Sequence, residues 1–466
     1  MNNNIILVAY LLSSILFIIA IKKLGKVNTA RQGNFLSAFA MLIAIIATSI
    51  KLEFYNPKFI IVGLIIGTII GLISAKKVAM TSMPELVAIF NGLGGGASGL
   101  VAIAALFLPD TQSVPDTQSV IADASIVLTI IIGTITFSGS FVAYGKLKGY
   151  ISSQPITYKG QNILNGLVLF SIIIISYFAI INPENINFFY IIIISGLLLG
   201  ILSVIPIGGA DMPVVISLLN SYSGIAAATA GFVLENHVLI VSGALVGASG
   251  IFLTNIMCKG MNRTLGNVLF SAFGSNENSA INESISGTNI AIKEMSADNA
   301  AYTMQASDSV IIVPGYGMAV AQAQHEVRKL SDELEKKGVT VKFAVHPVAG
   351  RMPGHMNVLL AEANIPYDKL FDMDEINSDF QNADIALIIG ANDVVNPAAK
   401  HNNSSPIYGM PVLDVEKAKT TFVLKRSMKP GFAGIENELF GYDNNYMIFG
   451  DAKDSISQFV ETLKEE

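Results

Sequence analysis

Two glycines, Gly315 and Gly317, stand directly after an apolar run and directly before a helical pattern. The run 309–313 is typical of a buried strand, and the pattern after the glycines predicts a helix over about 318–337. Glycines at this point let the backbone turn tightly and approach a pyrophosphate, whose charge would face the amide-rich start of the helix. The turn therefore predicts a dinucleotide site, although Val320 stands where a third glycine is usual.

Two later segments bear on which dinucleotide would bind. No acidic residue follows the predicted strand 339–345, where a carboxylate would hold a ribose 2′-hydroxyl; residues 346–351 read HPVAGR. This disfavours NAD and leaves room for NADP. Lys425, Arg426 and Ser427 follow another predicted strand, and two cations with a hydroxyl suit an extra phosphate. An ordinary solvated basic loop would have the same composition.

The residues Gly390, Ala391, Asn392 and Asp393 end a further predicted strand, at the edge where open parallel sheets bind ligands. Turn capping would explain Asp393 equally well. Strand-like runs alternate with helical patterns throughout this half, which predicts an α/β Rossmann-like parallel sheet covered on both faces. The strands are expected at 309–313, 339–345, 369–372, 384–390, 411–414, 420–424 and 445–449, with a last helix at 452–464.

The first half of the chain consists of apolar segments that are too long for a soluble core. A membrane span needs roughly 20 apolar residues, and somewhat shorter segments suffice with polar flanks. Nine segments qualify, so the fold class is a polytopic helical membrane domain followed by the α/β domain. They are 5–21, 35–50, 59–75, 84–108, 121–144, 164–181, 188–207, 212–234 and 237–257.

The loop charges predict the orientation of these spans. Most lysines and arginines of the short loops follow odd-numbered spans, whereas only Lys51 and Lys58 follow an even one. The N-terminus is therefore expected outside and the C-terminal domain in the cytoplasm, with the spans in the inner membrane. We predict a membrane domain at 1–263, a Gly- and Ser-containing flexible linker at 264–300 and a nucleotide domain at 301–466.

Composition narrows the remaining functions. Cys258 is the single cysteine, so there is no internal disulfide and no CxxC metal site. We expect no metal, and a net charge of -6 argues against nucleic acid as a partner.

Several spans carry small and polar residues. Glycines in 91–99, together with Gly243, Gly247 and Gly250, permit close helix contact, which would by itself explain them. Amides and hydroxyls at mid-membrane depth must bond one another or water, because hydrocarbon offers no partner. They are Asn91, Ser138, Ser140, Asn220, Ser221, Tyr222 and Ser223. A polar path through the bundle and purely structural bonds between helices both satisfy them.

With these residues in view, the whole chain resembles the beta subunit of the proton-translocating NAD(P) transhydrogenases. The similar segments include 313–324, VPGYGMAVAQAQ, and 346–360, HPVAGRMPGHMNVLL. In the membrane half they include 208–215, GGADMPVV, and 219–224, LNSYSG. The motifs MDEIN at 373–377, GAND at 390–393 and KRSM at 425–428 extend the resemblance.

The resemblance implies hydride transfer from NADH to NADP, driven by protons that move inward. It implies that NAD(H) binds a separate alpha subunit, that NADP(H) binds this chain, and that the complete enzyme is a dimer of alpha-beta units. No catalytic acid or base is expected, because hydride passes directly between two nicotinamides and the protein contributes positioning.

The resemblance also assigns residues. The cofactor-binding residues would be Gly315, Tyr316, Gly317, Met318, Ala319, Val320, Ala321, Val348, Ala349, Gly350, Arg351, Pro353, Gly390, Ala391, Asn392, Asp393, Lys425, Arg426, Ser427, Gly431, Phe432 and Ala433. Among them, 431–433 would form a lid, and Asp393 would sense protonation. The proton path would include Asn91, Ser140, Asn220 and Asp211.

One departure concerns the proton path. Some members of the family carry a histidine where this chain has Asn91, and an amide cannot take up a proton at neutral pH. Either a water chain suffices, or the alpha subunit contributes the titrating group. A channel or transporter gated by a nucleotide domain is the alternative function, but the chain has no TVGYG-type filter.

Overall fold

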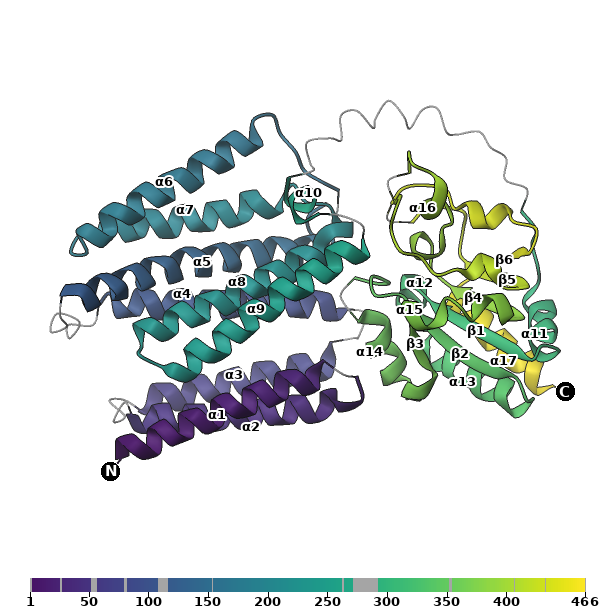
Figure 1. Cartoon of the computed structure of the whole chain (residues 1–466), viewed down its shortest axis with the longest axis horizontal. Helices are drawn as coiled ribbons and strands as arrows, with labels where there is room; N and C mark the ends of the chain where they lie inside the picture. The colour runs from purple at the N-terminus through teal and green to yellow at the C-terminus, as the bar shows by residue number, and fades with distance from the viewer. Residues whose placement is uncertain are drawn as a thin grey trace. The chain divides into compact units, whose positions relative to one another are not determined.

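The computed structural model divides the chain into two compact units, Met1–Thr254 and Asn255–Glu466, which are described separately (Figure 1). The structure describes residues 2–25, 27–51, 57–78, 82–107, 116–152, 154–261, 264–270, 292–351, 354–405, 407–431 and 433–465.

The first unit is a bundle of long helices. Among the described residues, nine helices are long and apolar enough to cross a membrane, and they correspond to the nine expected spans. The predicted fold class is confirmed for this half. The helices are α1 (Asn2–Leu24), α2 (Val27–Lys51), α3 (Pro57–Lys77), α4 (Met83–Ala105), α5 (Asp116–Lys148), α6 (Gln161–Ile181), α7 (Ile186–Val204), α8 (Met212–Val233) and α9 (His237–Gly260).

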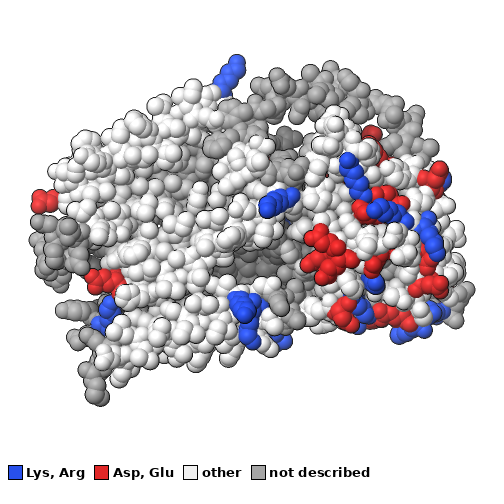
Figure 2. Space-filling model, viewed as in Figure 1, with Lys and Arg blue, Asp and Glu red and all other residues white. Residues whose placement is uncertain are grey.

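The helices differ in how much of their surface the bundle covers. In α8, 67% of the most apolar stretch is buried, whereas none of the corresponding stretch of α3 is. Figure 2 shows few charged side chains over the bundle and many over the second unit. Helices that are apolar on every side and exposed to this extent need lipid as their surroundings.

Glycines bring the central helices close together. A Cβ on Gly95 of α4 would lie 2.7 Å from the side chain of Thr136 in α5, and a Cβ on Gly200 of α7 would lie 2.1 Å from Ser138 Oγ. Gly224 of α8 meets Gly247 of α9 in the same way, at 2.4 Å from its backbone nitrogen. Helix contact therefore accounts for these glycines, as the small-residue pattern predicts.

The second unit is an α/β domain whose six parallel strands have the order β3-β2-β1-β4-β5-β6 (Figure 1). This confirms the predicted parallel sheet. The strands are β1 (Ser309–Pro314), β2 (Thr340–Val345), β3 (Leu370–Asp372), β4 (Ile385–Ile389), β5 (Thr420–Lys425) and β6 (Asn445–Phe449). The helices are α10 (Leu265–Phe270), α11 (Ala297–Gln305), α12 (Tyr316–Val320), α13 (Gln324–Lys336), α14 (His355–Glu362), α15 (Met373–Ile376), α16 (Ala398–His401) and α17 (Ala452–Lys464).

The two faces of the sheet are covered differently. Helices α11, α13 and α17 pack together, and α13 and α17 contact the sheet through β2 and β5. Short turns cover the other core, where Phe380, Leu413 and Phe440 are buried against strand residues such as Ile388. The connections after β4 and β5 are therefore irregular chain and not long helices. The backbone of these two connections is therefore not committed to long helices and can form a ligand-binding site.

Two expectations about this unit are wrong. Residues 411–414 form no strand, because Pro411 has no amide hydrogen and the Leu413 amide donates to the Val394 carbonyl outside any ladder. The helix expected over 318–337 is two helices, α12 and α13. Gln322 has a φ of 51° between them, and the Ala323 amide donates back to the Met318 carbonyl.

Part of the expected linker joins the sheet. The Met447 amide of β6 donates to the Lys293 carbonyl, and the Met295 amide donates to the Met447 carbonyl, at 2.8 and 3.0 Å. Ser296 then caps α11. Residues 271–291 of the expected linker lie outside the described residues.

The glycine contacts give a test within one helix. Gly95→Ala places a methyl group 2.7 Å from Thr136, and we expect it to destabilise the bundle by about 1–3 kcal/mol. Gly94→Ala, whose Cβ would meet nothing within 4 Å, should stabilise α4 by about 0.5–1 kcal/mol. Thermal unfolding in detergent measures both; equal shifts would contradict the packing argument.

Candidate nucleotide site and the polar cluster of the bundle

The site lies where the strand order reverses. β1 pairs with both β2 and β4, so the chain leaves β1 in one direction along the sheet and returns to the other side of it at β4. In open parallel sheets, ligands bind outside the carboxyl ends of the strands at this point. The turns after β1 and β4 both carry residues that the sequence singles out.

These two turns lie backbone against backbone. The Gly315 amide donates to the Ile389 carbonyl, and the Gly317 amide donates to the Gly390 carbonyl, each at 2.9 Å. A Cβ on Gly317 would lie 2.6 Å from the Gly390 Cα, and Gly390 itself has a φ of 63°. Contact between the turns therefore requires these glycines before any ligand is considered. Both glycine amides already have acceptors within the chain.

The residues after the second glycine face in different directions. Met318 and Ala319 are fully buried, whereas Val320 is 43% exposed. Met318 and Ala319 therefore offer a ligand only backbone. Tyr316 offers its ring, which lies under the Arg351 guanidinium at 4.7 Å from carbon to ring centroid. This cation-π contact joins the turn after β1 to the loop after β2.

Two buried histidines hold that loop. The Val348 amide donates to His346 Nδ1 at 3.2 Å, and the Arg351 amide donates to His355 Nδ1 at 3.1 Å. Each ring therefore carries its hydrogen on Nε2, and that of His346 donates to the Pro411 carbonyl at 2.8 Å. Gly350, with a φ of 110°, leaves room for the His355 ring. The sequence motif contained both histidines, but nothing in it revealed this bracing.

Burial keeps both rings neutral. Desolvation lowers the pKa of His346 to about 4, against a smaller opposing effect of its bond to Pro411. Desolvation also lowers the pKa of His355 to about 4, and the nearby Arg351 charge acts in the same direction. At neutral pH both therefore serve as fixed hydrogen-bonding groups and not as proton carriers.

The ends of β4 and β5 bring a carboxylate and an ammonium group to the same region. Asp393 Oδ2 accepts from the Ala433 amide at 2.9 Å, and a Cβ on Gly431 would lie 2.5 Å from Asp393 Oδ1. Lys425 donates to the Lys429 carbonyl and lies 5.0 Å above the Phe440 ring. Burial lowers the pKa of Lys425, and the charge of Asp393 opposes this shift.

The remaining predicted cofactor residues vary in their surroundings. Arg426 and Ser427 are exposed, Ala349 and Ala391 are buried, and Ala321 follows α12 directly. Pro353 and Phe432 lie outside the described residues.

In the bundle, polar side chains of three helices meet. Asn91 of α4 donates through Nδ2 to Ser140 Oγ of α5 at 3.1 Å, and Ser223 Oγ of α8 lies 2.8 Å from Asn91 Oδ1. Asn220 contributes its backbone carbonyl, 2.8 Å from the same hydroxyl. Ser223 was missing from the predicted proton path, although it lies three residues from Asn220 on the same helix face.

Other polar residues of the spans bond elsewhere. Ser138 bonds within its own helix to the Thr134 carbonyl, and Ser221 donates to the Gly247 carbonyl of α9. Asp211 is buried at the start of α8, roughly 13 Å along the helix from Asn220 by the usual helical rise. The structure thus joins Asn91 and Ser140, but not Asp211.

Comparisons with known proteins agree over both halves. The model of a family described as NAD(P) transhydrogenase beta subunit matches residues 6–462. The NAD(P) transhydrogenase subunit beta of Rhodospirillum rubrum is 49% identical over 465 residues, covering 99% of this chain and 100% of the relative. A sequence from a defined strain of the same organism gives the same values. The chain belongs to the NAD(P) transhydrogenase beta subunit family.

Membership of this family confirms the main functional prediction. The chain is a membrane-spanning subunit of a proton-translocating transhydrogenase, an oxidoreductase that handles nicotinamide nucleotides and acts with an alpha subunit. It is a multi-pass membrane protein. The alternative of a channel or transporter gated by a nucleotide domain has no support from the family.

The histidine braces predict a pH dependence. Unfolding raises the pKa of each ring from about 4 to the ordinary 6.5, so the unfolded chain binds more protons between these values. Their contribution to stability is therefore intact above about pH 6.5 and is lost as the pH falls toward 4.

Hydrogen exchange of residues 340–363 in the full complex, corrected for intrinsic rates, measures this loss. His346→Gln with His355→Gln should flatten the dependence. An unchanged slope would assign it to other groups.

Proposed function

We propose that the loops at the carboxyl ends of β1, β2, β4 and β5 bind NADP(H), while the alpha subunit binds NAD(H). The end of β2 carries the proposal, because neutral, buried His346 follows it where a carboxylate would select an unphosphorylated ribose. Cations follow β5 instead. Lys425, Arg426 and Ser427 would hold the 2′-phosphate, with Arg351 stacked on Tyr316 nearby.

When bound, NADP(H) would supply the redox chemistry, a hydride transfer to or from the NAD(H) of the alpha subunit. The chain's contribution is then to position and to exclude water. The paired glycine turns hold the loops after β1 and β4 in one geometry, and the histidine braces hold the loop after β2. On this proposal, hydride transfer itself requires no acid or base from the chain.

Asp393 provides a physical link between protonation and nucleotide release. Its carboxylate accepts the Ala433 amide and lies against Gly431, so it holds the segment that we propose as the lid, 431–433. A charged acceptor forms a stronger hydrogen bond than a neutral one. Proton uptake by Asp393 would therefore weaken the hold on the lid and favour exchange of the nucleotide.

Within the bundle we propose a proton path past Asn91, Ser140, Ser223 and the Asn220 carbonyl, with Asp211 farther along it at the start of α8. None of the first four groups titrates near neutral pH, so protons would pass along water, or a group of the alpha subunit would carry them. The loop charges support a cytoplasmic C-terminal domain, and the family resemblance implies inner-membrane spans and inward proton movement. A dimer of alpha-beta units follows from the family resemblance.

The phosphate site can be tested by removing one charge. Lys425→Ala should weaken NADP binding about tenfold or more, as for loss of a charge-assisted bond of ~1.5–3 kcal/mol, with little change for NAD. Lys419→Ala is the matched control, because it removes the same charge just before β5, at the strand's other end. Calorimetry on the alpha-beta complex measures both. Equal losses of NADP and NAD affinity would assign Lys425 a general structural role.

The coupling can be tested in vesicles that contain the alpha-beta complex. The wild-type enzyme should form NADPH from NADH faster under an inward proton gradient. Asp393→Asn keeps an acceptor for the Ala433 amide but cannot titrate, so the fold should persist while the gradient and the pH have less effect on turnover. Exchange insensitive to the gradient in the wild type would contradict the proposed coupling, and an unchanged pH profile in the variant would remove Asp393 from it.

A further inference from the structure

The segment 426–437, between β5 and the short helix η9 (Glu438–Gly441), has two unlike halves. Its first residues, 426–430, are exposed. Among its described residues, three positions of its later part are hydrogen-bonded to the connection that follows β4. The lid proposed above lies within this second half, so the attachments decide how far the lid moves.

The three attachments differ in chemistry. Ala433 is held by the carboxylate of Asp393, the group that is proposed above to take up a proton. The Glu436 carbonyl accepts from Asn396 Nδ2 at 3.0 Å, and Asn437 Nδ2 donates to the Asn392 carbonyl at 2.9 Å. Amides do not titrate in water. On that proposal, the attachment through Asp393 responds to pH and the two through asparagine amides do not.

Burial divides them in the same way. Asn396 and Asn437 are 0% and 1% exposed, whereas Asp393 is partly exposed. Each asparagine also uses its amide oxygen: Asn396 accepts from the Ala398 amide at 3.1 Å, and Asn437 accepts from the Leu439 amide at 3.0 Å. Both side chains are thus bonded at both ends in a dry environment, where a broken bond is costly.

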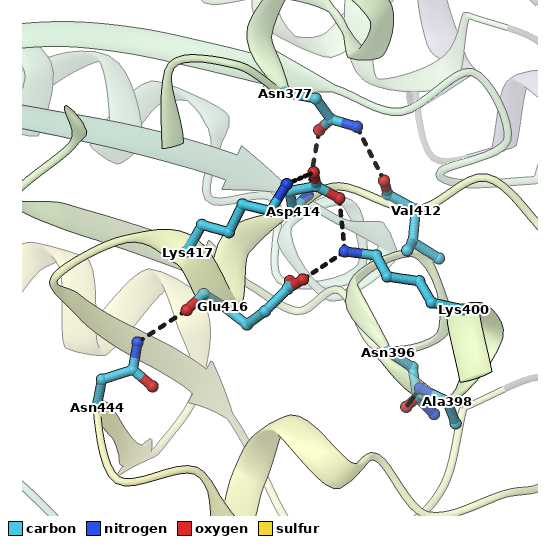
Figure 3. A network of polar contacts seen from close by, with 9 residues as sticks. All are labelled: Asn377, Asn396, Ala398, Lys400, Val412, Asp414, Glu416, Lys417 and Asn444. Carbon is cyan, nitrogen blue, oxygen red and sulfur yellow. Dashed lines mark hydrogen bonds and ion pairs between the residues drawn. The ribbon is translucent and has the colours of Figure 1, made fainter. Parts of the chain in front are cut away.

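The connection that receives these bonds is itself fixed. Asn396 leads into α16, whose Lys400 donates to Asp414 at 2.6 Å and also to Glu416 (Figure 3). The Asp414 amide donates in turn to Asn377 Oδ1 at 3.1 Å. Ion pairs and backbone bonds therefore hold the connection to the body of the domain beyond Asn396.

We propose that Asn396 and Asn437 form a permanent root for the lid, and that Asn437 is a positioning residue that sets how fast NADP(H) leaves. This inference rests on the proposed nucleotide function. Asn437 bonds the carbonyl of Asn392, the residue directly before Asp393. It thereby keeps Asp393 opposite Ala433, so that the titratable bond forms again after each opening.

Asn437 has two roles, a hydrogen bond to the Asn392 carbonyl and the cap of η9, and the decisive variant removes only the first. Asn437→Ser keeps an oxygen that caps η9 at the Leu439 amide, but the shorter side chain does not reach the Asn392 carbonyl. We expect NADP(H) to dissociate from the full alpha-beta complex about tenfold faster, as for one buried hydrogen bond of about 1.4 kcal/mol. Turnover should still depend on pH because the Asp393 carboxyl group is retained, but less steeply, because this variant no longer holds that group opposite Ala433.

Asn445→Ser is the matched control. Asn445 is equally buried in the same domain and bonds the Phe440 carbonyl and Thr421, away from the connection after β4. It should lower thermal stability as Asn437→Ser does, with a dissociation rate close to the wild type. Asn396→Ser, which loses the bond to the Glu436 carbonyl, is the second variant if Asn437→Ser does not fold.

Stopped-flow displacement of bound NADPH by excess NADP measures these rates. Faster release in Asn437→Ser or Asn396→Ser alone supports the root. Equal rates in wild type, variants and control, or equal acceleration in the control, overturn it. A wild-type complex that does not retain NADPH would instead overturn the proposed nucleotide function.

Discussion

The site depends on the close contact between the turns after β1 and β4. Gly315 and Gly317 donate their amides to the end of β4, and Gly390 turns at a positive φ so that the two backbones meet. Any side chain at these positions would separate the turns by more than the contact allows. Asp393 lies three residues after Gly390, and Tyr316 lies one residue after Gly315. The contact between the turns therefore also fixes the position of Asp393 relative to Tyr316. The positions of the charged and aromatic groups of the site therefore depend on the steric contact between the glycine turns.

Sequence reasoning recovered what hydrophobic periodicity records. The nine spans and six strands follow from apolar run length, and α17 begins and ends as predicted. It failed where tertiary contacts override local pattern: residues 411–414 have strand composition but bond to Val394 and Asn377, and Gln322 breaks a continuous helical pattern. The sequence also did not predict which side chains would bond to each other. Nothing in the sequence distinguished the Asn220 amide from the Ser223 hydroxyl as the partner of Asn91.

On the same helices of the bundle, the residues that allow close packing and the residues that form polar contacts lie at different positions. On α4 and α5, Gly95 makes room for Thr136, while Asn91 and Ser140 face each other one turn away. The close approach shortens the reach across the helices, so that short side chains bond directly. A cluster of amide and hydroxyl groups stores no charge, which avoids the cost of an ion in hydrocarbon. On the proposed proton path, charge would then be held at the ends of the bundle or by the partner subunit.

In the α/β domain, groups that stay uncharged near neutral pH are likewise distinct from the group that is proposed to take up a proton. His346 and His355 are buried far enough to stay neutral, and Asn396 and Asn437 have no accessible ionisation. These fixed groups shape the loops, and the proposed proton-sensitive acceptor is the partly exposed carboxylate of Asp393, which holds the Ala433 amide. If the histidines and asparagines also titrated, proton uptake would loosen several loops at once, and its effect would not be confined to the lid. Under the proposed mechanism, confining the change to one bond would let a single proton act on the lid while the geometry that positions the nucleotide persists.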